Sequence, residues 1–138
     1  MTETVTEIFE GFKLNLPSLL FYFFFILRRQ VMVTVLIFLP TKGLFQCTVH
    51  ILCSAFILIY AITYKPYEND LLNFQEICNE SFTLLSGYHM LMFTDFIPDD
   101  ATVLNTGKNL KHQLGWSFLA IIGTNLLINL AIIAREII

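Results

Sequence analysis

Long apolar runs recur along this sequence, and they constrain its fold more than any other feature. Residues 44–64 and 114–134 form two such runs, and neither contains Asp, Glu, Lys or Arg. A helix needs about 20 apolar residues to cross the hydrocarbon core of a bilayer. We therefore expect two membrane-spanning helices here, the second with Asn125 and Asn129 one turn apart on a small and polar face.

The run at 71–96 is also long enough to cross a bilayer, but it carries Glu76, Asn79 and Glu80. A carboxylate at membrane depth is costly and needs a partner. One stripe of this helix is polar or small, because its members lie three or four residues apart: Asn73, Glu76, Glu80, Thr83 and Gly87. The stripe faces water and ions, another helix of the chain, or a partner protein.

Residues 16–39 are apolar except for a central polar group that includes Arg28, Arg29 and Gln30. In one interpretation the chain bends at the arginines, and the aromatic first half lies among lipid headgroups. In the other, a single helix spans the bilayer, and the arginines snorkel or pair with acids. Glu76 and Glu80 are available counter-charges for such pairs. The simpler alternative is that the arginines hold phosphate headgroups.

The composition places the chain among integral membrane proteins. Only 14 % of its residues are charged and 56 % are hydrophobic, whereas a soluble domain has about 25 % charged residues. The net charge of −3 excludes the basic surface that nucleic-acid binding requires. The three cysteines lie in apolar segments and indicate neither disulfides nor a metal site. His50 is alone in its run, which favours a packing role over metal or haem binding.

Residues 1–15 show the pattern of a short amphipathic helix, with four apolar residues on one face and three glutamates on the other. We expect this helix to lie at the membrane interface or against a partner. Residues 16–138 form one unit, with spans at about 16–39, 44–64, 71–96 and 114–134. The predicted fold class is therefore all-α: an integral membrane helical bundle with three to four transmembrane helices.

No enzyme motif is present, since the sequence lacks a Gly-rich phosphate loop, HExxH, CxxC and GxSxG. We expect a non-catalytic protein with no cofactor. Its candidate functional residues are polar groups at membrane depth. They comprise an intramembrane charge network of Arg28, Arg29, Glu76 and Glu80, and polar helix faces with Asn73, Asn79, Asn125 and Asn129.

Distinctive short motifs lie between residues 18 and 133: Arg28-Arg29, Lys65-Pro66-Tyr67-Glu68, Asn73, Glu76, Asn79-Glu80, Thr94-Asp95-Phe96, Pro98-Asp99 and Gly115-Trp116. Together they resemble the C-terminal membrane portion of large TRP-like multi-pass proteins of ciliates and other protists. The resemblance implies an all-helical bundle related to a cation-channel domain, with the last two spans in the position of pore helices. The loop at 96–112, however, is too short for an obvious re-entrant pore helix and carbonyl filter.

We expect the protein to be a structural or accessory subunit of a larger membrane-embedded complex, such as a respiratory or ATP-synthase assembly of a protist mitochondrion. Its expected partners are other membrane subunits and membrane lipids. The mitochondrial inner membrane is the first expected location, and the plasma or ciliary membrane is the alternative. In the rival hypothesis the chain is part of a TRP-like cation channel, and the path is lined by Asn73, Glu76, Glu80, Asn125 and Asn129.

Overall fold

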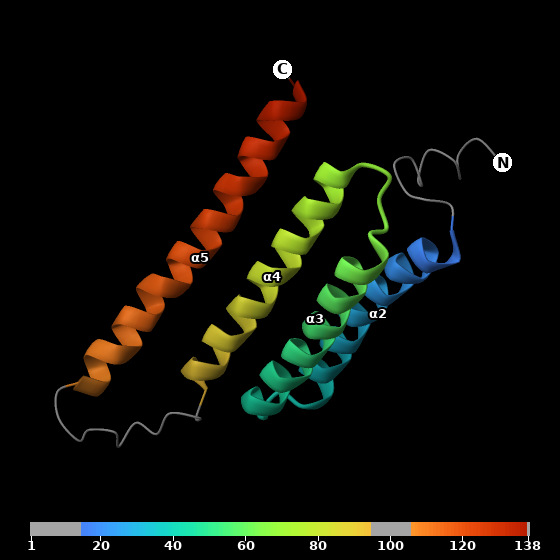
Figure 1. Cartoon of the computed structure of the whole chain (residues 1–138). Helices are drawn as coiled ribbons and strands as arrows, with labels where there is room; N and C mark the ends of the chain where they lie inside the picture. Colours follow the sequence, from blue (N-terminus) through green and yellow to red (C-terminus); the bar gives the residue numbers. More distant parts are fainter. Residues whose placement is uncertain (1–14, 95–105, 138) are drawn as a thin grey trace.

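The computed structural model describes residues 15–94 and 106–137, and this part of the chain contains four α-helices (Figure 1). The helices are α2 (Leu16–Phe38), α3 (Gly43–Tyr64), α4 (Asp70–Phe93) and α5 (Thr106–Ile137). They confirm the predicted all-α bundle. The amphipathic helix expected at residues 1–15 lies outside the described residues, apart from Asn15.

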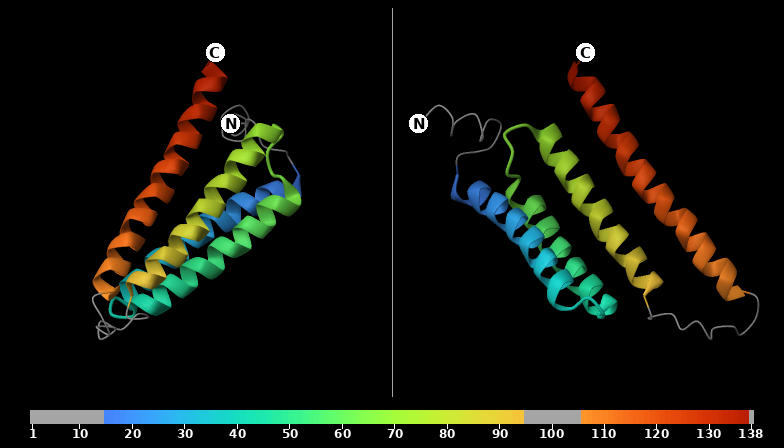
Figure 2. Two further views of the ribbon diagram at one scale, coloured as in Figure 1. Left: turned by 60° about the vertical axis from the view of Figure 1, so that its left-hand side comes forward. Right: turned by 180° about the vertical axis from the view of Figure 1, so that it is seen from behind.

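The helices lie side by side in chain order, and each runs antiparallel to the next (Figures 1 and 2). Among the described helices, the backbones approach closely in the consecutive pairs α2–α3, α3–α4 and α4–α5. The helix α4 therefore lies between α3 and α5, where it contacts a helix on each side.

The helix α2 continues through Arg28 and Arg29 without a break. The interpretation in which the chain bends at the arginines is therefore wrong. The physical reason is that Arg and Gln are good helix formers, so that polarity alone does not interrupt a helix. Pro17 lies in the first turn, where its missing N–H is not needed, and Pro40 follows the helix end.

The connection between α3 and α4 is specified by local chemistry. Lys65 caps α3 in the left-handed conformation, with φ of 42°, and its N–H donates to the Ala61 carbonyl at 3.0 Å. Pro66 then prevents the helix from continuing. Asn69 caps α4, because its side-chain oxygen accepts from the Leu71 N–H at 2.9 Å.

Three helical segments of the described chain are long and apolar enough to cross a membrane: α2, α3 and residues 112–135 of α5. The protein is therefore a multi-pass membrane protein. The run expected to span at 71–96 forms the helix α4, but α4 is not among these three segments. The reason is its composition, since Asp70, Glu76, Glu80 and several amides lower its apolar content.

Few side chains are fully buried inside the bundle. The main apolar cluster consists of Phe21, Ile57 and Ala61, with Tyr60 and Ile77 packed against it, and Ile132 of α5 is buried separately. Large hydrophobic side chains remain exposed on all four helices. Such surface is unfavourable in water and favourable in lipid or against other membrane helices. Without a large apolar core, polar contacts and close packing hold the helices in register.

Candidate functional site

Arg28 and Glu80 form a bidentate ion pair that joins α2 to α4. The Arg28 Nη2 donates to Glu80 Oε1 at 2.8 Å, and the Arg28 Nη1 donates to Glu80 Oε2. The Arg28 side chain is 11 % exposed and that of Glu80 is 3 % exposed. Because both groups are withdrawn from solvent, each supplies the counter-charge that the other requires. The pair ties together the two helices that flank α3.

The other two members of the predicted charge network, Arg29 and Glu76, are not part of this ion pair. Arg29 is exposed, and its guanidinium lies over the Phe25 ring, 4.6 Å from the centroid. Glu76 is half-buried, and it has no hydrogen bond or ion pair within the part of the chain that the structure describes. The structure therefore brings together one arginine and one glutamate of the four predicted residues.

The face of α4 that carries Glu80 is its most buried face. The buried residues of this helix are Asn73, Glu80 and Gly87, which recur every seven residues and so share one side. Gly87 permits close approach to α3, because a methyl group there would lie 3.1 Å from Ile51 Cγ1 and 3.2 Å from His50 Cδ2. The lack of a side chain at Gly87 thus allows α3 to pack against α4 two turns after Glu80.

Two polar residues of α3 lie on the side that meets α4. His50 contacts the Gly87 position, and Ser54 follows one turn later with no exposed surface. The His50 Nδ1 and Ser54 Oγ atoms are buried, and neither has a hydrogen-bond partner among the described residues. Within the same residues no three side chains of His, Cys, Asp or Glu gather as metal ligands, and all three cysteines are free.

A second polar contact joins α4 to α5 through side-chain amides. Asn129 donates to Asn79 Oδ1 at 2.7 Å and to Asn125 Oδ1 at 3.0 Å, and it accepts from Gln75 Nε2 at 2.8 Å. Three of the four asparagines that the sequence singles out therefore meet in one cluster. Because an asparagine amide donates twice and accepts twice, Asn129 can serve as the centre of such a cluster.

Sequence reasoning missed two contributors to the α4–α5 contact. Gln75 was not singled out, although it lies one turn before Asn79. His89 is not among the candidate residues either, and its Nε2 lies 3.1 Å from the Ser117 hydroxyl of α5. The signal for both is a second polar stripe on α4 at positions 75, 79 and 89, which a search for one polar face overlooks.

Asn73 lies apart from the other asparagines and holds the α3–α4 connection. Its side chain accepts from the Tyr67 N–H at 2.9 Å and donates to the Tyr67 carbonyl at 2.9 Å. Burial raises the pKa of the Tyr67 phenol to about 12, and the negative charges of Glu76 and Glu80 add to this effect. This end of the bundle is thus fixed by a residue that the sequence assigned to a helix face.

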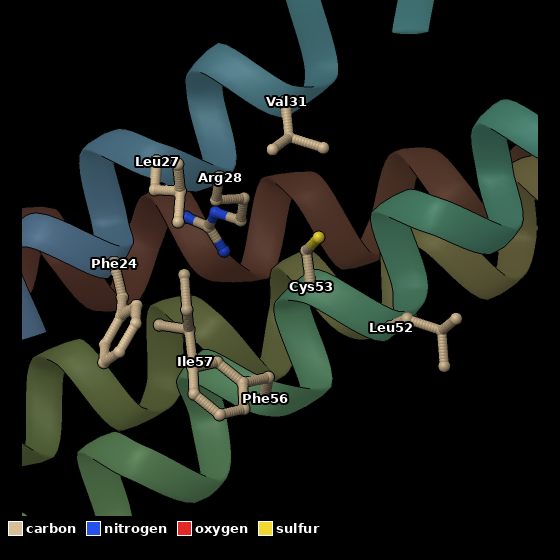
Figure 3. Close-up of a pocket in the computed structure, with 8 residues that line it drawn as sticks. All are labelled: Phe24, Leu27, Arg28, Val31, Leu52, Cys53, Phe56 and Ile57. Carbon is tan, nitrogen blue, oxygen red and sulfur yellow. The ribbon is translucent and has the colours of Figure 1, made fainter.

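A pocket of about 310 Å³ opens between α2 and α3, and Arg28 is one of its lining residues (Figure 3). Its lining is almost wholly apolar and is given by eight residues: Phe24, Leu27, Arg28, Val31, Leu52, Cys53, Phe56 and Ile57. Since Arg28 is paired with Glu80, its side chain contributes mainly its stem to the pocket. The pocket can accommodate a lipid chain or an apolar side chain.

Comparison with known proteins identifies no family. The chain matches no protein-family model, and no curated protein or solved structure shows significant similarity to it. The resemblance to TRP-like proteins therefore gains no support beyond its short motifs. The findings establish a small helical membrane protein with three candidate membrane spans in its described part.

Proposed function

We propose that this protein is a non-catalytic structural or accessory subunit of a larger membrane-embedded complex. The observation that carries the proposal is the Arg28–Glu80 pair. A carboxylate that binds an arginine of the same chain in two hydrogen bonds stabilises the bundle and is not available to a passing solute. Glu80, Asn79 and Gln75 of α4 thus bind neighbouring helices.

The outer surfaces of the bundle support the proposal that the protein binds other membrane subunits. Among the described helices α5 packs closely against α4 alone, and its remaining faces expose large apolar side chains, such as Leu126 at 61 % and Leu127 at 67 %. The helix α2 likewise exposes apolar residues along its length. These faces fit lipid tails and the helices of other membrane subunits.

The rival proposal is a component of a TRP-like cation channel. It requires Asn73, Glu76, Glu80, Asn125 and Asn129 to line one path. In the structure Asn125 and Asn129 lie on the α5 side of α4, whereas Glu80 is paired with Arg28 of α2. The arrangement favours the structural subunit, because the five residues do not share one surface.

The proposed setting is an energy-converting complex of a protist mitochondrion, either a respiratory or an ATP-synthase assembly. The inner mitochondrial membrane is then its location, with the plasma or ciliary membrane as the alternative. Fractionation of cells that express a tagged chain tests this setting, because enrichment with mitochondrial inner-membrane markers is expected. Enrichment in plasma or ciliary membrane would refute it.

The decisive experiment for the subunit proposal is isolation of the full chain from its native membrane in a mild detergent. We expect it to migrate with other membrane proteins in a complex of fixed stoichiometry. A homo-tetramer would favour the channel, and a lone monomer would contradict both proposals. The Glu80→Gln variant should enter the complex less efficiently, because loss of the ion pair loosens α2 from α4.

A further inference from the structure

Arg29 carries a positive charge that the described part of the chain does not neutralise. Its guanidinium contacts the Phe25 ring, but it forms no ion pair among these residues. The neighbouring Arg28 already occupies the Glu80 carboxylate in two hydrogen bonds. Arg29 is exposed on the surface of α2. Within the described residues, Arg29 is therefore a cation without an ion-pair partner on the surface of a mostly apolar helix.

The position of Arg29 along α2 places its charge at membrane depth, far from both ends of the helix. Arg29 lies nine residues before Phe38, which is about 14 Å of helix at roughly 1.5 Å per residue. It lies 13 residues after Leu16, or about 20 Å. Since α2 is one of the candidate spans, the guanidinium is far from both of its ends. A cation at such depth requires an anion or a hydrated surface next to it.

The residues around Arg29 form a seam suited to another helix. Ile26, Arg29, Val33 and Leu36 recur with spacings of three, four and three residues, and all are exposed. This is the spacing with which one helix lies along another. The three apolar members are about half exposed, at 49 %, 49 % and 51 %. The seam is thus an apolar stripe that contains a single positive charge.

We propose that this seam binds a transmembrane helix of another subunit that carries an Asp or Glu at the depth of Arg29. The inference rests on the proposed function and names the surface through which the subunit docks. Charge complementarity selects the partner, because an apolar helix would leave the guanidinium unpaired. Phe25 supports the arginine from one side, so that its outer edge remains available to a carboxylate.

A lipid phosphate is a poorer match for this position. Phosphates lie at the membrane interface, whereas the nearer end of α2 is about 14 Å of helix from Arg29. An Arg side chain that snorkels covers only part of that distance. A carboxylate on a neighbouring helix reaches the same depth without deforming the bilayer.

The test uses the full chain in its native membrane with Arg29→Lys. A membrane-permeant carbodiimide condenses a lysine amine with an adjacent carboxylate to an amide, and the reagent takes up the oxygen as a urea. We expect Arg29→Lys to yield an adduct with an Asp or Glu in a transmembrane segment of another subunit, located by peptide mass spectrometry. Gln30→Lys is the matched control, because it places the same amine on the next face of α2 and should yield no such adduct.

A charge-reversal experiment provides the second readout. Arg29→Glu should lower the fraction of the chain found in the complex by about tenfold or more, because two carboxylates would then face each other at low dielectric. Replacing the crosslinked partner acid with Lys should restore assembly. Equal assembly of wild type and Arg29→Glu, no adduct above the Gln30→Lys control, or an adduct with a second copy of this chain would each overturn the proposal. A wild-type chain without any partner would instead refute the subunit function itself.

Discussion

Replacement of Glu80 by Gln should destabilise the bundle, because it removes the charge from a desolvated ion pair while keeping the size of the side chain. Exposed ion pairs contribute about 0–1 kcal/mol, whereas breaking a buried pair costs about 3–5 kcal/mol. The side chains of Glu80 and Arg28 are only 3 % and 11 % exposed, so their pair is close to the buried case. We expect Glu80→Gln to lower the free energy of unfolding by about 3 kcal/mol.

A double-mutant cycle separates the pair from other effects of the substitution. Arg28→Met removes the guanidinium and retains most of the apolar stem, so that it should cost about as much as Glu80→Gln. The double variant contains neither of the two charges, so no buried charge is left without a partner. We therefore expect its loss to be smaller than the sum of the two single losses by about 2 kcal/mol.

The assay is reversible unfolding in mixed detergent micelles, followed by helical circular dichroism and by the fluorescence of the single tryptophan, Trp116. Glu76→Gln serves as the matched control, since Glu76 lies one turn from Glu80 without an ion pair in the described structure. Its coupling to Arg28→Met should be clearly smaller than that of Glu80→Gln, because the charges of Glu76 and Arg28 interact without forming an ion pair in the described structure. Additive effects of Glu80→Gln and Arg28→Met would refute the claim that the pair stabilises the fold.

Three further substitutions test other contacts. Asn129→Leu should cost about 1–2 kcal/mol and more than Asn125→Leu, because Asn129 makes the amide bonds to α4, and equal losses would contradict this. Gly87→Val should lower the free energy of unfolding by about 1–3 kcal/mol, because it separates α3 from α4. Gly115→Val is the control, since a side chain added at Gly115 would meet no atom within 4 Å. An equal loss in both variants would argue against close packing at Gly87. The phenol pKa of Tyr67 is about 12 in the folded chain, against a reference value of 10.0, so folding favours the protonated phenol. The stability that this contributes to the fold is fully present below pH 10 and should be lost as the pH rises through about 12. In a tyrosinate absorbance titration Tyr67→Phe should remove a component near pH 12, and loss of a component near pH 10 would contradict the assignment.

The helices could be predicted from the sequence because their limits depend on local signals. Pro40 and Gly43 bound the turn between the first two helices, and Lys65-Pro66 ends the second of them. Apolar length predicted spans at 44–64 and 114–134, and the helices there are long and apolar enough to cross a membrane. The same criterion also selected 71–96, but the polarity of α4 keeps it out of the three candidate segments.

The pairing within the charge network could not be predicted, because it depends on how two helices that are distant in sequence are aligned. Arg28 and Arg29 point about 100° apart on the helix, so only one of them can face α4. Glu76 and Glu80 differ by one turn of α4, and the depth at which α4 lies beside α2 selects between them. That depth follows from the Gly87 contact and the α3–α4 connection, neither of which a pattern of charges records.

The asparagines Asn73 and Asn79 have different structural roles for a similar reason. Asn73 and Asn79 are six residues apart, which places them on different sides of a helix. Asn73 therefore fixes the connection before α4, and Asn79 joins the cluster at Asn129. Their common residue type concealed two separate structural roles.

Cation flux through liposomes that contain the purified chain tests the central claim most directly, namely that the buried carboxylate of Glu80 holds helices together and does not conduct. We predict no flux of K⁺ or Na⁺ above that of protein-free liposomes under an applied potential, for the wild type and for Glu80→Ala alike. A flux in the wild type whose ion selectivity changes in Glu80→Ala, while circular dichroism shows the helices intact, would contradict the account.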